Sequence, residues 1–86
     1  MTAMRAKMRI SHIEVYANQE GDPTQETMNF QAVSRSDGYP ADGSDEDNTY
    51  AKFSPSGNLS LTVANPALLG KFKVGEKYYL DFTRAA

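Results

Sequence analysis

Aromatic and basic residues alternate in three short runs of the sequence. The runs are YAKF at residues 50–53, KFK at residues 71–73 and KYY at residues 77–79. Aromatic rings stack on nucleobases, and lysine and arginine side chains pair with phosphates. This chemistry predicts a shallow site for an anionic, ring-containing ligand such as a nucleotide. The residues that we expect to line the site are Tyr50, Lys52, Lys73 and Tyr79, with Arg9 or Arg35 nearby.

Catalytic chemistry has little support in the same sequence. A hydrolytic triad needs a base such as histidine beside its nucleophile, and His12 is the single histidine. His12 lies where the apolar pattern of a strand changes phase, which is typical of a partly exposed residue at the rim of a sheet. The sequence contains neither a Walker phosphate loop nor a dinucleotide-binding fingerprint. We therefore expect a protein that is not an enzyme and that carries no cofactor.

Charge is distributed unevenly along the chain, whose net charge is −2. Residues 20–47 hold eight acids against one base, a local charge of −7, whereas residues 1–19 carry +2 and residues 48–86 carry +3. General nucleic-acid binders usually show a domain-wide basic excess, so nucleic acid is not the expected partner. The carboxylates of residues 42–47 do not follow the order of an EF-hand loop. We expect no metal, and a flexible, solvated acidic loop at residues 36–48.

The length of 86 residues, with a mass of 9.5 kDa, predicts one domain over residues 1–86. A domain of this size buries only about 60% of the surface that its unfolded chain exposes. The chain has no cysteine, so disulfides cannot add stability, and a homo-oligomer is the expected support. No run approaches the roughly 18 apolar residues of a membrane span, and no signal-peptide pattern is present. We expect a protein that stays away from membranes, in the compartment where it is made.

Alternating apolar and polar residues predict strands over most of the chain. Apolar residues take the even positions from residue 4 to 10 and the odd positions from residue 13 to 17, so the phase changes around Ser11 and His12. A one-residue change of phase within a strand predicts a β-bulge or a sharp bend. Four further strands are expected at residues 26–35, 49–54, 59–63 and 77–84.

These elements predict an all-β fold. Asn65, Pro66 and Gly70 have the types expected at the cap, the first position and the end of one short helical turn. Five antiparallel strands of this length bury one face by curling into a barrel. We therefore expect a small five-stranded antiparallel barrel, OB-like or SH3-like. Leu61 and Leu80 should be core residues on facing strands, and the strand at residues 49–54 should be the edge that pairs in a dimer.

About half of the chain resembles small uncharacterised proteins of tailed bacteriophages and prophages. The resemblance is carried by DEDNTYAKFSPSGNLSLTV at residues 45–63, NPA at residues 65–67 and FKVGEKYYLDFT at residues 72–83. It implies a viral accessory protein and brings no known active site with it.

Two classes of function follow from the residues and this resemblance together. The first is a non-enzymatic binding protein in the host cytoplasm, which counters host defence by binding a nucleotide signal or a host protein. The second is a structural accessory subunit of the virion, in the capsid or the tail. Binding of single-stranded DNA is a third option, which the acidic middle of the chain disfavours.

Overall fold

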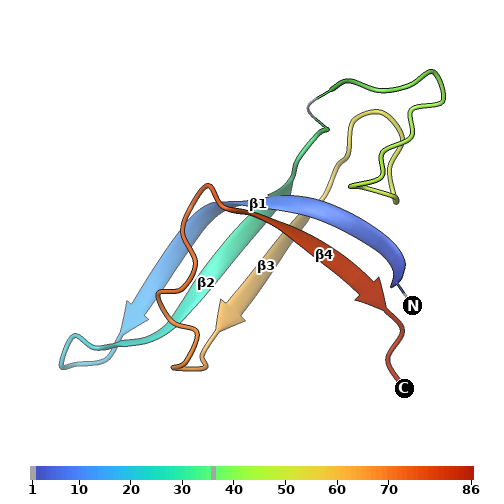
Figure 1. The fold of residues 1–86 in the computed structure, drawn as a ribbon. Helices are drawn as coiled ribbons and strands as arrows, with labels where there is room; N and C mark the ends of the chain where they lie inside the picture. The colour runs from blue at the N-terminus through green and yellow to red at the C-terminus, as the bar shows by residue number, and fades with distance from the viewer. Residues whose placement is uncertain (1, 36) are drawn as a thin grey trace.

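The protein is a single antiparallel sheet of four strands (Figure 1). The structure, a computed structural model, describes residues 2–35 and 37–86. The strands are β1 (Thr2–Ala17), β2 (Pro23–Ala32), β3 (Asn58–Val63) and β4 (Lys77–Thr83), in the spatial order β3-β2-β1-β4. The predicted all-β class is confirmed. The described residues contain no helix, and hence none that could span a membrane.

Strand β1 organises the sheet because its two halves pair with different neighbours. Residues 2–9 pair with β4, and residues 8–17 pair with β2. The pairing with β2 shifts by one residue between Ile10 and His12, so the bulge predicted from the change of phase is confirmed. The extra residue, Ser11, lets Ile10 and Ile13 face the same side of the sheet. Its hydroxyl donates a hydrogen bond of 3.1 Å to the Asn29 carbonyl.

The predicted closed barrel of five strands is not formed by the described residues. Strands β3 and β4 are the two edges of an open sheet, and residues 49–54 form turns instead of a strand. The Thr49 N–H donates to the Arg5 carbonyl, which fastens the start of this segment to β1. Phe53 has a φ of 61°, in the left-handed region that a strand residue does not adopt. The expected third strand, and with it the expected dimer edge, was therefore a wrong prediction.

In the segment between β3 and β4, the predicted cap at Asn65 is found, but the predicted helical turn is not. The Asn65 side chain accepts a hydrogen bond of 3.0 Å from the Ala67 N–H, as a cap would. The Asn65 carbonyl accepts from the Leu68 N–H at 2.9 Å, and Gly70 has a φ of 75°. These bonds close consecutive turns over residues 66–70, and no helix follows.

One face of the sheet is apolar and carries the core. Its buried side chains come from three strands: Ala6, Met8, Ile10, Met28, Phe30 and Val63. The segment after β3 crosses this face (Figure 1), where Leu69 and Phe72 pack against the core. This cover is partial, because Val15 and Leu61 stay 57% and 48% exposed.

The expectation that Leu61 and Leu80 are core residues on facing strands was wrong. Leu61 is about half exposed, and Leu80 is half-buried at the margin of the core. The two residues belong to opposite edges of the sheet. A barrel would enclose both side chains, whereas one open sheet covered by a short loop leaves its edge strands partly uncovered.

Candidate functional site

The polar face of β1 and β4 gathers six side chains with binding chemistry. The register sets Arg5 opposite Asp81, Lys7 opposite Tyr79, and Arg9 opposite Lys77. Directly opposite residues of antiparallel strands project from the same face. These six residues form three adjacent rows, which we call the β1–β4 polar patch. Four cations and one carboxylate meet there, with one aromatic ring between them.

In the first row of the patch, the positive charge of Arg5 is balanced by the negative charge of Asp81. The Arg5 Nε and Nη2 atoms donate to the two oxygens of Asp81, at 2.7 and 3.1 Å. This hydrogen bonding, more than the Arg5 charge itself, lowers the pKa of Asp81 below its ordinary value. The Arg5 guanidinium carbon also lies 4.4 Å from the centre of the Tyr79 ring, a cation–π contact.

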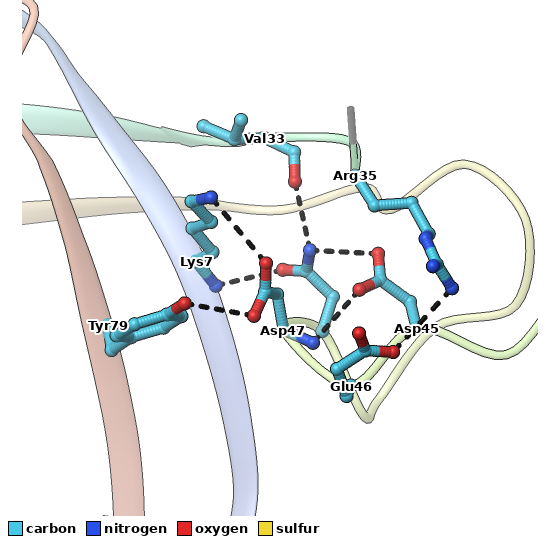
Figure 2. A network of polar contacts seen from close by, with 8 residues as sticks. Lys7, Val33, Arg35, Asp45, Glu46, Asp47 and Tyr79 are labelled. Carbon is cyan, nitrogen blue, oxygen red and sulfur yellow. Dashed lines mark hydrogen bonds and ion pairs between the residues drawn. The ribbon is translucent and has the colours of Figure 1, made fainter. Parts of the chain in front are cut away.

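The middle row is neutralised by a residue from outside the sheet. The Tyr79 hydroxyl donates a hydrogen bond of 3.0 Å to Asp47 Oδ1, and Lys7 Nζ lies 3.5 Å from Asp47 Oδ2 (Figure 2). Although its hydroxyl is held, the Tyr79 side chain remains exposed. The ring is therefore held by Asp47 at its hydroxyl and by Arg5 over one face, and the exposed remainder is what a ligand could contact.

The third row differs from the other two because it holds only positive charge. Arg9 and Lys77 are both exposed and lie directly opposite each other. Neither side chain forms an ion pair with any residue in the described ranges 2–35 and 37–86. Like charges directly across two strands are destabilising. A bound anion would relieve this repulsion through charge-assisted hydrogen bonds.

The acidic segment, residues 42–48, packs against the sheet through Asn48 and Asp45. Figure 2 shows Asp45 and Asp47 of this segment beside Lys7 and Val33. Asn48 is fully buried and Asp45 is 4% exposed. Asn48 Nδ2 donates to the Val33 carbonyl at 2.9 Å and to Asp45 Oδ2 at 3.1 Å, and Asn48 Oδ1 accepts from the Lys7 N–H at 2.9 Å. Asp45 Oδ1 accepts from the Asp47 N–H at 2.9 Å. This packing places the Asp47 carboxylate beside Tyr79 and Lys7.

The solvated acidic loop expected from the charge pattern is thus wrong in one respect. Glu46 and Asp42 are exposed as expected, whereas Asp45 is buried. The buried carboxylate is tolerated because both of its oxygens accept hydrogen bonds. The flexibility expected for residues 36–48 stays a prediction.

The structure places two of the six predicted site residues in the patch and the other four outside it. Arg9 and Tyr79 belong to the β1–β4 polar patch. The Tyr50 hydroxyl lies near Gly57 and the core residue Met8, on the opposite face of the sheet. A Cβ atom at Gly57 would be 3.5 Å from that hydroxyl and 3.6 Å from the terminal methyl of Met8. The expected neighbourhood of Tyr50 and Tyr79 is therefore not found.

The other three predicted site residues lie on loops and are not members of the patch. Arg35 Nη1 donates to the Ser44 carbonyl at 3.2 Å and lies 3.6 Å from Glu46 Oε2. Lys52 is exposed. The pKa of Asp42 is lowered mainly by hydrogen bonds from Ser44, and the positive charge of Lys52 lowers it further. Lys73 is exposed in the turn before β4, and its N–H donates to the Glu76 side chain at 2.9 Å.

Sequence reasoning missed Lys77, Lys7 and Arg5 as partners of Arg9 and Tyr79. The alternation of basic residues at positions 5, 7 and 9 was the available signal, because it places all three on one face of β1. The pairing of β1 with β4 supplied the remaining residues, and a long-range register cannot be read from either strand alone.

The patch is an open surface, since the described part of the chain has no pocket. Within that part, no three metal-ligating side chains are grouped so as to hold an ion. Comparisons of the chain with protein-family models, curated proteins and solved structures give no match. The binding chemistry of this protein is therefore inferred from its own residues.

Proposed function

We propose that this chain is a non-enzymatic binding protein whose β1–β4 polar patch takes an anionic, ring-containing ligand such as a nucleotide. The observation that carries the proposal is the cross-strand pair of Arg9 and Lys77, which has no carboxylate partner among the described residues and lies one row from Tyr79. A phosphate bridges the two cations, and the base stacks on the exposed ring.

The resemblance to phage proteins supports a place for this binding in infection. The protein acts as a viral accessory protein in the host cytoplasm and counters host defence by binding a nucleotide signal. A host protein is the other ligand that such an accessory protein would take, and an open face without a pocket suits it as well. The active species is a homo-oligomer, which the small size of the chain and its lack of cysteine favour.

A structural accessory subunit of the capsid or tail is the second candidate, and the shape of the chain favours it. The molecule measures 56 × 32 × 16 Å, and both edges of its sheet lack a neighbouring strand within the described ranges. Such edges are suited to assembly with other chains. Mass spectrometry of purified particles separates the candidates, because a virion part is present in stoichiometric amounts. Single-stranded DNA has weaker support, since the local charge of −7 would repel it.

Calorimetry against mono-, di- and cyclic nucleotides tests the main proposal. We expect one class of nucleotide to bind below millimolar concentration. Tyr79→Ala should lower the affinity by about 1–3 kcal/mol, or roughly 5- to 150-fold, through loss of stacking. Tyr79→Phe keeps the ring and should retain most of the affinity, although it loses the bond to Asp47. Arg9→Ala and Lys77→Ala should each weaken binding.

Tyr50→Ala and Lys52→Ala are the matched controls, because they remove the same residue types away from the patch. They should leave the affinity unchanged. If they weaken binding as much as Tyr79→Ala and Lys77→Ala do, the site has been misplaced. If no nucleotide binds at millimolar concentration, the nucleotide proposal fails and the virion candidate gains.

A further inference from the structure

The single chain exposes more surface than a folded monomer of its mass. Its accessible surface is 6138 Å², whereas a 9.5 kDa monomer exposes roughly 5,000 Å². The radius of gyration is 15.7 Å, against about 12 Å for a compact domain of this length. The excess of about 1,100 Å² compares with the roughly 800 Å² that each partner buries in a standard interface. The chain therefore has enough uncovered surface for one stable contact.

The outer edge of β3 is the least protected edge of the sheet. β3 pairs with β2 on one side, and no strand in the described ranges pairs with its other side. Natural edge strands are usually guarded by charge, proline or a bulge. The six residues of β3, NLSLTV, contain no charge, proline or glycine, whereas the β4 edge carries Lys77 and Asp81. An edge strand without such protection indicates that another strand pairs with it in the folded assembly.

The sequence of β3 is complementary to itself in one antiparallel register. If Leu61 lies opposite Leu61 of a second copy, then Leu59 lies opposite Val63, and Ser60 lies opposite Thr62. This register pairs apolar side chains on one face and hydroxyls on the other, both of which are favourable cross-strand pairs. The hydroxyl row already begins inside the chain, where the Thr27 and Thr62 hydroxyls lie 3.0 Å apart.

We propose that two copies of this chain pair through the outer edges of β3, about a two-fold axis that sets Leu61 opposite Leu61. The pairing joins two four-stranded sheets into one of eight strands, and it covers side chains that are half exposed in the single chain. It deepens the homo-oligomer proposed above and rests on it. The β1–β4 polar patch stays free, because β2 and β1 separate β4 from the β3 edge.

Sedimentation equilibrium of charge variants tests both the contact and its register. The unmodified protein should give a molar mass twice that of the 9.5 kDa chain. Leu61→Lys and Leu61→Glu should each sediment as 9.5 kDa monomers, since like charges then meet across the axis. An equimolar mixture of the two should restore the dimer. Val15→Lys is the matched control on the same apolar face, and it should stay dimeric.

A cross-link tests the same register without adding charge. The chain has no cysteine, so Leu61→Cys introduces one thiol for each copy. Opposite residues of antiparallel strands have Cα atoms about 4.5–5.5 Å apart, within the range that a disulfide spans. Mild oxidation should link Leu61→Cys into a covalent dimer, and Val15→Cys should stay unlinked.

Each other result overturns a stated part of the proposal. An unmodified protein of 9.5 kDa at high micromolar concentration would overturn the oligomer itself. A dimer that survives in Leu61→Lys would overturn the β3 contact alone. If the mixture of Leu61→Lys and Leu61→Glu stays monomeric and Leu61→Cys forms no covalent dimer, the register is overturned. Nucleotide binding by the monomeric variants is measured separately, so failure of the patch and failure of the dimer are distinguishable.

Discussion

Asn48 is the residue through which the acidic segment is fastened to the sheet, and its removal should cost much of the folding stability. The Asn48 side chain is fully buried and makes three hydrogen bonds, to the Val33 carbonyl, the Lys7 N–H and the Asp45 carboxylate. Asn48→Ala removes one partner from each of these groups. Among the described residues, no other side chain makes a hydrogen bond to the Val33 carbonyl, the Lys7 N–H or Asp45 Oδ2.

The size of the effect follows from the groups left behind. A buried polar group that loses its partner costs about 1–3 kcal/mol. Three such groups at the lower end of this range give a loss of about 3 kcal/mol. Small domains are stable by about 5–15 kcal/mol, so the variant should be folded but close to its limit.

Urea unfolding at one fixed protein concentration measures this loss. With a slope of about 1 kcal/mol per molar urea, typical of a small domain, the midpoint should fall by about 3 M. Asn29→Ala is the matched control, because Asn29 is half-buried and its side chain makes no hydrogen bond to the described residues. That variant should unfold within about 0.5 kcal/mol of the parent. Equal midpoints for Asn48→Ala and Asn29→Ala would refute the anchoring role.

Two further changes have directions that the structure fixes. Gly43→Ala should destabilise more than Gly38→Ala in urea unfolding: both glycines have positive φ (74° and 76°), but only at Gly43 would the new Cβ lie 2.6 Å from the Phe53 ring; equal losses would contradict the contact. The pKa of Asp81 is lowered by its hydrogen bonds from Arg5, so this pair adds stability above the unfolded pKa of 3.8, which is lost as pH falls through the lower folded value. Thermal unfolding from pH 2 to 6 should therefore show a shallower acid dependence for Asp81→Asn, and an unchanged profile would count against the pair.

The bulge and the polar side of β4 could be predicted from the sequence because both depend on local pattern. The change of phase at Ser11 and His12 predicts the register shift directly. The position of Tyr79 among polar residues predicts its exposure on the face opposite Leu80. A two-residue period carries this information within a single strand.

The open four-stranded sheet and the membership of the β1–β4 polar patch could not be predicted from local pattern. Residues 49–54 alternate like a strand, but they form turns. The Arg5 and Lys7 N–H groups of β1 donate hydrogen bonds to the Thr49 and Asn48 side chains, and Phe53 has a positive φ. Those bonds join residues more than 40 positions apart. The same holds for the β1–β4 polar patch, whose charge balance depends on pairing between the two ends of the chain.

Ligand binding at the β1–β4 polar patch is tested most directly by NMR titration of ¹⁵N-labelled protein with the nucleotide panel. We predict that the amide signals of Lys7, Arg9, Lys77 and Tyr79 shift together and saturate, while those of β3 stay in place. Signals that shift around Tyr50 and Lys52 instead, or a spectrum unchanged at millimolar nucleotide, would contradict the proposed site.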